Sequence, residues 1–299
     1  MKQTALKVLT VAVLTSVVSS WTALAQTSLT VVSAADYNSA YGSVAPGSIV
    51  SMFAANIATG TFFAENLPLP TSLGAVSATI SEGPNMLPIQ LIAVTPLQVN
   101  AVLPSGFIGT IVNLTTSNGQ QISGPISMDL TAPSLFTADE SGTWLPAAQV
   151  LTVHADGSQT FMSSVAMCSD TLVWNGSTWS RCVPIPIDLG SSTDQVILEL
   201  FGTGVRGVNS LPQNVQEVDV DVSCAMADPL GCNFSNGSSL NVLYAGAQGA
   251  GLPGSFAGLD QVNVLLPHSL AGSGMVFLTV SVSDGFEVNG SNAVTLGIQ

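Results

Sequence analysis

The feature that most constrains this chain is an internal duplication. The segment Gln98–Pro104 (QVNAVLP) returns as Gln261–Pro267 (QVNVLLP). Each copy follows a hydrophobic run typical of a strand, with Phe53 in the first run and Phe201 in the second. A repeated structural unit informs about architecture. Neither copy carries a nucleophile with its base, a metal-ligand cluster or a phosphate loop, so the duplication predicts a fold and no chemistry.

Strand patterns dominate the chain after residue 25. The runs are short, rich in β-branched residues and separated by Gly, Pro, Asn and Ser, as is typical of strands. No segment of about ten or more residues combines a 3.6-residue apolar period with helix caps, so the chain is expected to be all-β. The expected strands are 48–53, 75–80, 99–103, 110–115 and 125–130 in the first half, and 195–201, 218–222, 240–244, 261–266, 275–282 and 293–298 in the second.

The two copies predict two domains of similar size. Each copy is about 100 residues long, as immunoglobulin-like domains are, and the regular strand-and-turn spacing favours sandwiches. We therefore predict two tandem immunoglobulin-like β-sandwich domains, 26–132 and 194–299. Between them we predict a bridging β section, 133–193, with hairpin signals at Asp156-Gly157 and Asn175-Gly176. This section is interpreted as a small subdomain or linker that belongs with the second domain.

Residues 1–25 have the order of a secretory signal peptide. Lys2 and Lys7 precede an uncharged apolar run, 8–18, and the small-residue segment Ala23–Ala25 follows it. The run is shorter than the ~20 apolar residues that span a bilayer, and no later stretch approaches that length. We expect cleavage after Ala25 and a soluble chain that is secreted or held at the cell surface, without membrane insertion.

The mature chain is acidic and sparsely charged. Without Lys2 and Lys7, its basic residues are Arg181 and Arg206 against 18 acidic ones, a net charge of −16. This sign repels phosphate backbones and anionic headgroups, so nucleic acid and membrane surfaces are unfavourable partners. Charged residues make up 7% of the sequence and hydrophobic residues 46%. That balance excludes wholesale disorder, which needs the reverse.

Four cysteines lie in the second half of the chain. In an exported protein they predict disulfides, and four cysteines allow three pairings. We favour Cys168 with Cys182 and Cys224 with Cys232, because each pair closes a short local loop. The alternative, a zinc site, needs closer CxxC-like spacing.

Several segments resemble the Solibacter-type C-terminal domain family of secreted acidobacterial proteins. In the first half they are Val44–Phe53 (VAPGSIVSMF), Leu69–Val76 (LPTSLGAV), Pro96–Asn100 (PLQVN) and Ala132–Thr137 (APSLFT); in the second they are Leu200–Gly207 (LFGTGVRG), Val242–Ala247 (VLYAGA), Gly258–Asn263 (GLDQVN) and Leu266–Gly272 (LPHSLAG). The resemblance runs from about residue 30 to the end. It implies tandem immunoglobulin-like sandwiches of the IPT/TIG type, and no activity, because the family has none assigned.

Side chains suited to catalysis are scarce. His154 lies at a predicted hairpin turn and His268 follows a strand-ending proline, so both are interpreted as loop residues. No Gly-x-Ser-x-Gly elbow accompanies them. We therefore expect no enzymatic activity and no cofactor.

Polar residues of the repeated segments have a structural interpretation. Gln98 and Asn100 share one strand face, as do Gln261 and Asn263. Side-chain amides there can satisfy backbone groups, and ligand binding is the alternative. Asp260 is interpreted as a turn cap.

Two further groups are candidate sites. Glu217, Asp219 and Asp221 alternate with valines, which places three carboxylates on one strand face; calcium could neutralise them, and a solvated outer face is the alternative. Trp174 and Trp179 flank Asn175-Gly176 on the predicted disulfide hairpin. Exposed aromatic faces can hold sugar rings, and the alternative is that these indoles cover a small core.

Together these patterns predict a non-catalytic binding, adhesion or scaffolding module that acts outside the cytoplasm. The expected partner is a cell-surface or extracellular protein or glycan. A carbohydrate-binding module that uses Trp174 and Trp179 is the first alternative function, and a polysaccharide hydrolase or its accessory is the second. Edge strands also permit self-association.

Overall fold

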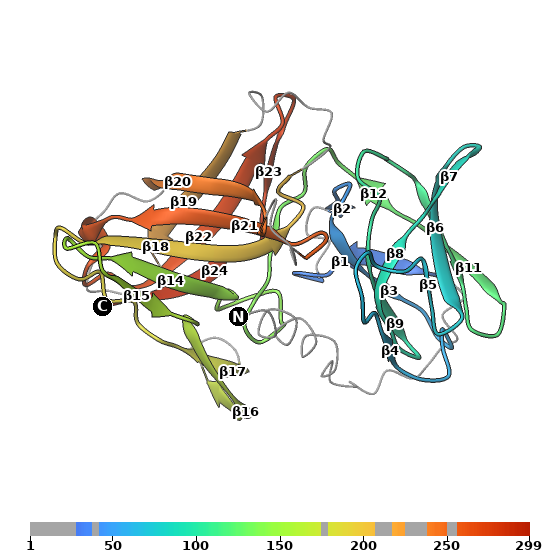
Figure 1. Cartoon of the computed structure of the whole chain (residues 1–299), viewed down its shortest axis with the longest axis horizontal. Helices are drawn as coiled ribbons and strands as arrows, with labels where there is room; N and C mark the ends of the chain where they lie inside the picture. The colour runs from blue at the N-terminus through green and yellow to red at the C-terminus, as the bar shows by residue number, and fades with distance from the viewer. Residues whose placement is uncertain (1–27, 38–41, 175–178, 207–216, 225–237, 250–255) are drawn as a thin grey trace.

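The computed structural model describes residues 28–37, 42–174, 179–206, 217–224, 238–249 and 256–299. Its described part is all-β, apart from one 3₁₀ turn, η1 (His268–Leu270). Two sandwiches lie side by side along the long axis of the molecule (Figure 1). The predicted fold class is therefore confirmed. The signal peptide prediction lies outside the described residues.

The first sandwich consists of two facing sheets. One has the strand order β1-β3-β9-β8-β4, and the other has the order β11-β10-β6-β5 with β7 paired to β6; β2 and β12 form a short parallel pair. The strands are β1 (Thr30–Ser33), β2 (Ser43–Val44), β3 (Ile49–Phe53), β4 (Phe62–Phe63), β5 (Ser72–Leu73), β6 (Val76–Glu82), β7 (Asn85–Pro88), β8 (Gln90–Val94), β9 (Gln98–Val102), β10 (Ile111–Thr115), β11 (Gln121–Pro125) and β12 (Ser127–Met128).

The second sandwich repeats this plan with longer strands. Its main sheet has the order β15-β14-β18-β21-β20-β19-β22-β23, with β13 on β18 and β24 on β22, while β16 and β17 pair with each other. The strands are β13 (Ser134–Leu135), β14 (Ala148–Val153), β15 (Gln159–Met162), β16 (Ala166–Trp174), β17 (Trp179–Pro184), β18 (Gln195–Thr203), β19 (Glu217–Cys224), β20 (Ser238–Ala247), β21 (Asp260–Leu266), β22 (Gly274–Ser283), β23 (Val288–Gly290) and β24 (Val294–Ile298).

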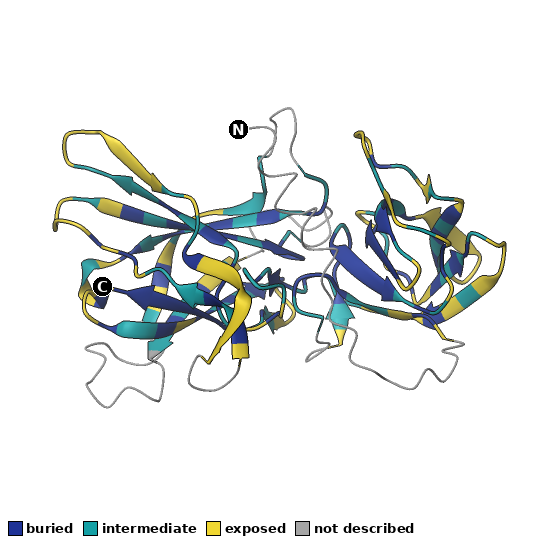
Figure 2. Cartoon of the chain, turned by 90° about the horizontal axis from the view of Figure 1, so that it is seen from below, coloured by how far each residue is buried: buried dark blue, intermediate teal, exposed yellow. Residues whose placement is uncertain are grey.

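The register of the strands reproduces the sequence duplication. Gln98 of β9 pairs with Phe53 of β3, and Gln261 of β21 pairs with Phe201 of β18. The series β1-β3-β9-β8 in the first sandwich thus corresponds to β14-β18-β21-β20 in the second. Alternate residues of these strands point inward and form one apolar core in each sandwich. Figure 2 shows buried residues in both.

The section 133–193 differs from the predicted bridge. β14 pairs along its length with β18, and Val150 lies opposite Leu198 in the core of the second sandwich. The predicted turn at Asp156-Gly157 joins β14 to β15, and Gly157 adopts a φ of +82°. β14 is part of the main sheet of the second sandwich, so within the described part of 133–193 it is the hairpin β16–β17 that stands apart from this sheet. No helix in the described ranges is long and apolar enough to cross a membrane.

Candidate binding surface

The hairpin β16–β17 is closed by the predicted disulfide. Cys168 and Cys182 lie directly opposite each other in the pairing of the two strands and are bonded. This half of the predicted disulfide pattern is confirmed. The second predicted pair, Cys224 with Cys232, lies outside the described residues because Cys232 is not among them.

One face of the hairpin is anchored on the second sandwich. The buried Ser180 donates a hydrogen bond from Oγ to Oδ2 of Asp139 at 2.8 Å. Cys182 is buried in a small cluster with Leu145 and Ala166, and Trp144 packs against this cluster. Nε1 of Trp144 donates to the carbonyl oxygen of Cys182 at 3.4 Å. The indole that covers a small core here is therefore Trp144.

Trp174 and Trp179 lie on the opposite face of the hairpin, toward solvent. They are cross-strand partners, with ring centroids 5.7 Å apart and planes inclined at 62°. Their side chains are 52% and 64% exposed. Since side chains alternate along a strand, the buried Ser180 forces its neighbour Trp179 outward. The interpretation of these two indoles as core residues is wrong, and the aromatic-platform interpretation fits their exposure.

The apolar surface continues along β16 behind the two indoles. The pairing of the strands shifts between Cys168 and Val173, where several residues of β16 face the single residue Arg181 of β17. Such a bulge bends the strand and re-aims its side chains. Leu172, two residues before Trp174, shares its face and is 53% exposed, whereas Val173 lies opposite Ser180 on the other face. An edge-to-face indole pair with an adjacent leucine is thus presented to solvent on a hairpin that protrudes from the sandwich (Figure 1).

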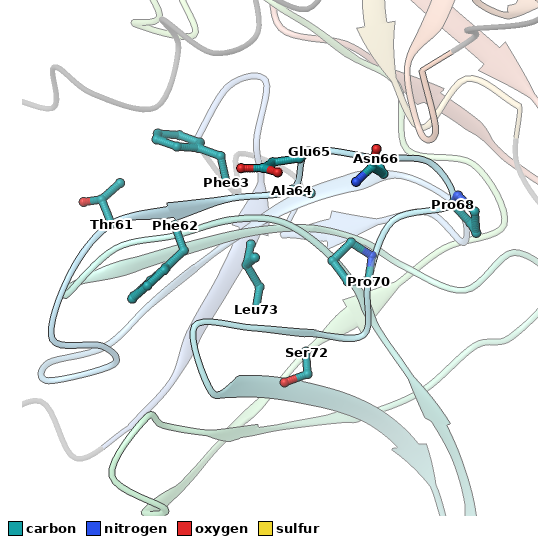
Figure 3. A pocket seen from close by; sticks show the side chains of 10 residues that line it. All are labelled: Thr61, Phe62, Phe63, Ala64, Glu65, Asn66, Pro68, Pro70, Ser72 and Leu73. Atoms are coloured by element: carbon teal, nitrogen blue, oxygen red, sulfur yellow. The ribbon is translucent and has the colours of Figure 1, made fainter.

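A second candidate site is an open groove in the first sandwich (Figure 3). Its volume is about 640 Å³. The ring of Phe62 lies over Gly74, where a methyl group would come within 2.3 Å of Cδ2. Glu65 and Asn66 supply polar groups at its rim. Sequence reasoning missed this groove; the signal was the run of aromatic and proline residues. The lining residues are Thr61, Phe62, Phe63, Ala64, Glu65, Asn66, Pro68, Pro70, Ser72 and Leu73.

The predicted calcium candidates lie on the solvent face of β19. Glu217 and Asp219 are exposed, and Asp221 is partly exposed. Successive carboxylates alternate with inward-facing valines, so they are about 6–7 Å apart along the strand. Their partners across β22 are hydroxyl residues rather than acids. No group of three His, Cys, Asp or Glu suited to a metal occurs in the described ranges. The arrangement therefore matches the solvated-face alternative.

The repeated amides have different surroundings in the two copies. In the first copy, Nε2 of Gln98 donates to Oδ1 of Asn100 at 2.7 Å, and Oγ of Ser51 donates to the same oxygen at 3.1 Å. All three side chains are buried. In the second copy, Nε2 of Gln261 donates to Oδ1 of Asn263 at 2.8 Å, on a partly exposed face. These contacts are the structural role that the sequence predicted, with side-chain partners in place of backbone ones.

His154 belongs to a hydrogen-bonded chain that the sequence did not predict. Its Nδ1 lies 3.1 Å from Oδ2 of Asp194, and its Nε2 lies 2.9 Å from Oγ1 of Thr160. The hydrogen bond from His154, followed by one from Ser191, holds the pKa of the Asp194 carboxyl below its usual range. The connectivity matches that of a hydrolytic triad, but Thr160 lies on the exposed edge strand β15. Triad chemistry also needs oxyanion donors near the hydroxyl, and no contact of Thr160 in the described chain identifies one.

Asp260, the first residue of β21, and Arg206 fix the turn that follows β18. Asp260 is buried and accepts hydrogen bonds from Nε of Arg206 and, at 2.8 Å, from the backbone nitrogen of Val205. Burial raises the pKa of the Asp260 carboxyl, while the Arg206 guanidinium acts in the opposite direction. Asp260 therefore caps this turn, as predicted. His268, also predicted to be a loop residue, lies in the turn η1, where its Nε2 contacts the carbonyl oxygen of Ser191 at 2.6 Å.

Comparison with known proteins does not place the chain in a family. No protein-family model matches the chain, and no curated protein matches it. Similar solved structures include the C-terminal domain of the AgI/II polypeptide BspA of Streptococcus agalactiae, with 12% identity over 86% of this chain and 95% of that one and a TM-score of 0.19. The viral chemokine-binding protein R17 of rodent gammaherpesvirus Peru has 9% identity over 85% and 87%, with a TM-score of 0.18. Similarity at this level supports no conclusion about the family or function of the chain, and the Solibacter-type assignment stays a prediction.

Proposed function

We propose that the protein is a non-catalytic binding module that acts outside the cytoplasm, and that Trp174 and Trp179 form its contact surface for a glycan. The observation that carries this proposal is the exposure of both indoles, at 52% and 64%, on a hairpin closed by a disulfide. Large exposed apolar patches mark interaction sites in soluble proteins. The disulfide is consistent with an oxidising compartment.

The geometry suits a sugar ring better than a charged ligand. The apolar face of a pyranose needs a flat aromatic surface, and indoles supply it together with an N–H that can bond a hydroxyl. Two rings inclined at 62° form a corner that can contact two faces of one sugar. Arg181, which shares the strand face of Trp179, adds hydrogen-bond donors at the edge of the pair. The strong acidity of the chain disfavours anionic polysaccharides, so a neutral glycan is the expected ligand.

The test is a glycan array followed by calorimetric titration of any hit. We expect saturable binding that weakens about 10- to 100-fold in Trp174→Ala, as the loss of an aromatic anchor of about 1.4–2.8 kcal/mol implies. Phe286→Ala is the matched control, because Phe286 is 84% exposed and lies at the β22–β23 turn, away from the hairpin. Phe62→Ala tests the groove of the first sandwich in the same assay.

Other outcomes assign the surface differently. A blank array together with tryptophan-dependent binding to intact cells would indicate a protein ligand and remove the glycan from the proposal. Binding lost in Phe62→Ala and kept in Trp174→Ala would move the site to the groove. Release of sugar from a polysaccharide would contradict the non-catalytic assignment, and Asp194→Asn would then test the hydrogen-bonded chain at His154.

A further inference from the structure

The outer face of the first sandwich is covered by the second domain. Ile49 and Val102, which are paired across β3 and β9, are only 2% and 5% exposed. The side chains packed against them include Phe136 and several from the segment 256–259, all from the second domain. This face of the first copy is therefore closed to a ligand.

The repeated amides of the covered face hold the hydroxyl of an aromatic ring. Tyr37, in the loop after β1, forms hydrogen bonds with Gln98 and Ser51. Its ring centroid lies 6.2 Å from that of Phe53, the cross-strand partner of Gln98. Nε2 of Gln98 also donates to Asn100. In the first copy, the amide cluster thus binds a hydroxylated ring that belongs to the chain itself.

The second copy presents the equivalent face to solvent. Gln261 and Asn263 are partly exposed, and so is Glu199, the partner of Asn263 on β18. Glu199 stands where the first copy has Ser51. Gln149 of β14 lies opposite Glu199 and donates a hydrogen bond to its carboxylate. Amide and carboxylate side chains therefore line a face that water reaches.

Tyr244 adds an aromatic ring at the end of this row. It is the partner of Asn263 on β20, and its side chain is 38% exposed. Oη of Tyr244 donates to the carbonyl oxygen of Ala247 at 2.6 Å, which fixes the ring along the strand. The ring lies over Gly246, where a methyl group would come within 3.0 Å of Oη. The first copy has Ala93 at the equivalent position, so this ring has no counterpart there.

The two amides of the second copy keep unused hydrogen-bonding groups. Nε2 of Gln261 donates to Oδ1 of Asn263, whereas Oε1 of Gln261 and Nδ2 of Asn263 have no hydrogen-bond partner among the described residues. The carboxylate of Glu199 adds acceptors, and the amide of Gln149 adds a donor and an acceptor. A phenol offers one hydroxyl and a sugar offers several, so this set of groups matches a sugar better.

We propose that the open face of the second sandwich binds a neutral sugar ring, at a site separate from the tryptophan hairpin. The residues that form the site are Gln149, Glu199, Gln261, Asn263 and Tyr244. The ring of Tyr244 offers flat apolar area, and the polar groups beside it fix the orientation of the sugar through its hydroxyls. The contact of Tyr37 is the internal precedent, because the first copy fills the same face with a ring of its own.

The experiment is an NMR titration of the exported chain carrying Trp174→Ala and Trp179→Ala, so that the hairpin contributes nothing. The probes are neutral cello-, laminari-, xylo- and manno-oligosaccharides. We expect saturable shifts of the side-chain amide signals of Gln261 and Asn263 with at least one probe. Tyr244→Ala in the same background should weaken binding about tenfold, as the loss of an aromatic anchor implies.

Further variants separate the site from a general effect on the fold. Asn263→Ala removes the unused donor and should also weaken binding. Gly246→Val pushes the ring of Tyr244 away from the strand without removing it, so it should act in the same direction. Phe277→Ala is the matched control and should bind like its parent, because Phe277 is 37% exposed and lies on β22, in the other layer. Thermal unfolding of each variant checks the fold.

The outcomes distinguish this site from the hairpin. If no probe binds in the background without the two indoles, the proposal is overturned, and glycan binding by the unchanged chain would then belong to the hairpin alone. Binding that persists unchanged in Tyr244→Ala and Asn263→Ala also overturns it. Amide shifts with a tyrosine-containing peptide and none with the sugars would assign the face to a protein partner instead. Sugar binding that depends on Tyr244 and is indifferent to Trp174→Ala would keep this site and remove the hairpin from the proposed function.

Discussion

The strands β9 and β21, which carry the repeated segment, have almost the same sequence, but their outer faces have different surroundings. All five residues of β9 are buried, whereas in β21 buried and partly exposed residues alternate. The inward-facing valines pack into a core in both copies. The difference lies entirely on the outer face, where the first copy is covered by the second domain. Similar segments thus fold alike, and their function follows from what covers them.

The sheets of the two sandwiches differ as well. In the first copy β8 and β6 belong to separate sheets. In the second copy β20 is ten residues long and pairs with both β21 and β19, which joins the two layers into one continuous sheet. The longer β20 thus joins two layers that the first copy keeps as separate sheets.

The largest expected effect on stability comes from replacing two isoleucines at equivalent positions of the two copies. Ile49→Ala removes a fully buried side chain from the interface between the sandwiches and should lower the free energy of unfolding by about 2–5 kcal/mol. Ile197→Ala, at the partly exposed equivalent position, should cost about 1 kcal/mol or less. Denaturant titration of both variants measures the difference. Equal losses would mean that the outer face of the second sandwich is covered in solution as fully as that of the first.

A smaller effect is expected from the repeated asparagines. Asn100→Ala leaves the buried donors of Ser51 and Gln98 without their shared acceptor, at a cost of about 1–3 kcal/mol. Asn263→Ala loses one contact, with Gln261, on a face that water can reach, so about 0.5 kcal/mol is expected. The same denaturant titration compares the two. A costly Asn263→Ala would show that the amide pair is needed independently of burial.

The buried cluster of Ser51, Gln98 and Asn100 also takes part in a contact between the domains. The pKa of Tyr37 is raised, first by burial and then by the charge of Glu140. Tyr37 belongs to the first domain and Glu140 to the second, and hydrogen bonding of Tyr37 to Gln98 and Ser51 links it to the cluster. The first copy therefore builds its domain interface partly from polar groups that find partners in one another.

Much of the fold followed from the sequence because strand signals are local. The duplication and the alternation in β18, β21 and β22 predict paired strands directly. By contrast, β8 and β11 were not predicted, and 125–130 is a strand only at Ser127–Met128. β8 and β11 each pair with a predicted strand across a short turn, β9 and β10 respectively, whereas Ser127–Met128 pairs with Ser43–Val44, far along the chain. The bridge 133–193 was set apart because spacing along the chain does not reveal that β14 pairs with β18.

The candidate site was predicted only in part. The sequence marked Trp174 and Trp179 and the disulfide beside them, but it did not reveal which tryptophan is buried. That depends on which face of the hairpin meets Asp139 and Leu145, contacts from outside the hairpin. The hydrogen-bonded series Asp194–His154–Thr160 was missed for the same reason. The groove at Phe62 is lined by residues 61–73, so its signal was local, but the run of aromatic and proline residues was not interpreted as a site. His154 and Asp194 are neighbours only because β14 pairs with β18.

The smallest expected effect is a pH dependence confined to the second copy. The folded-state pKa of Asp194 is lowered, chiefly by the hydrogen bond from His154, so its ionised form stabilises the fold above the pKa of the unfolded chain. This contribution is lost as the pH falls through the folded-state value, below about pH 4. Asp194→Asn should therefore lower the melting temperature slightly at neutral pH, where the ionised carboxylate stabilises the fold, and change it little in acid, so the acid limb of a plot of melting temperature against pH becomes flatter. Ser191→Ala, which removes a weaker partner of the same carboxylate, should flatten it less. If the acid limb were identical in Asp194→Asn and in the unchanged protein, the hydrogen bond between His154 and Asp194 would not stabilise the fold. The two copies would then not differ in stability through this contact.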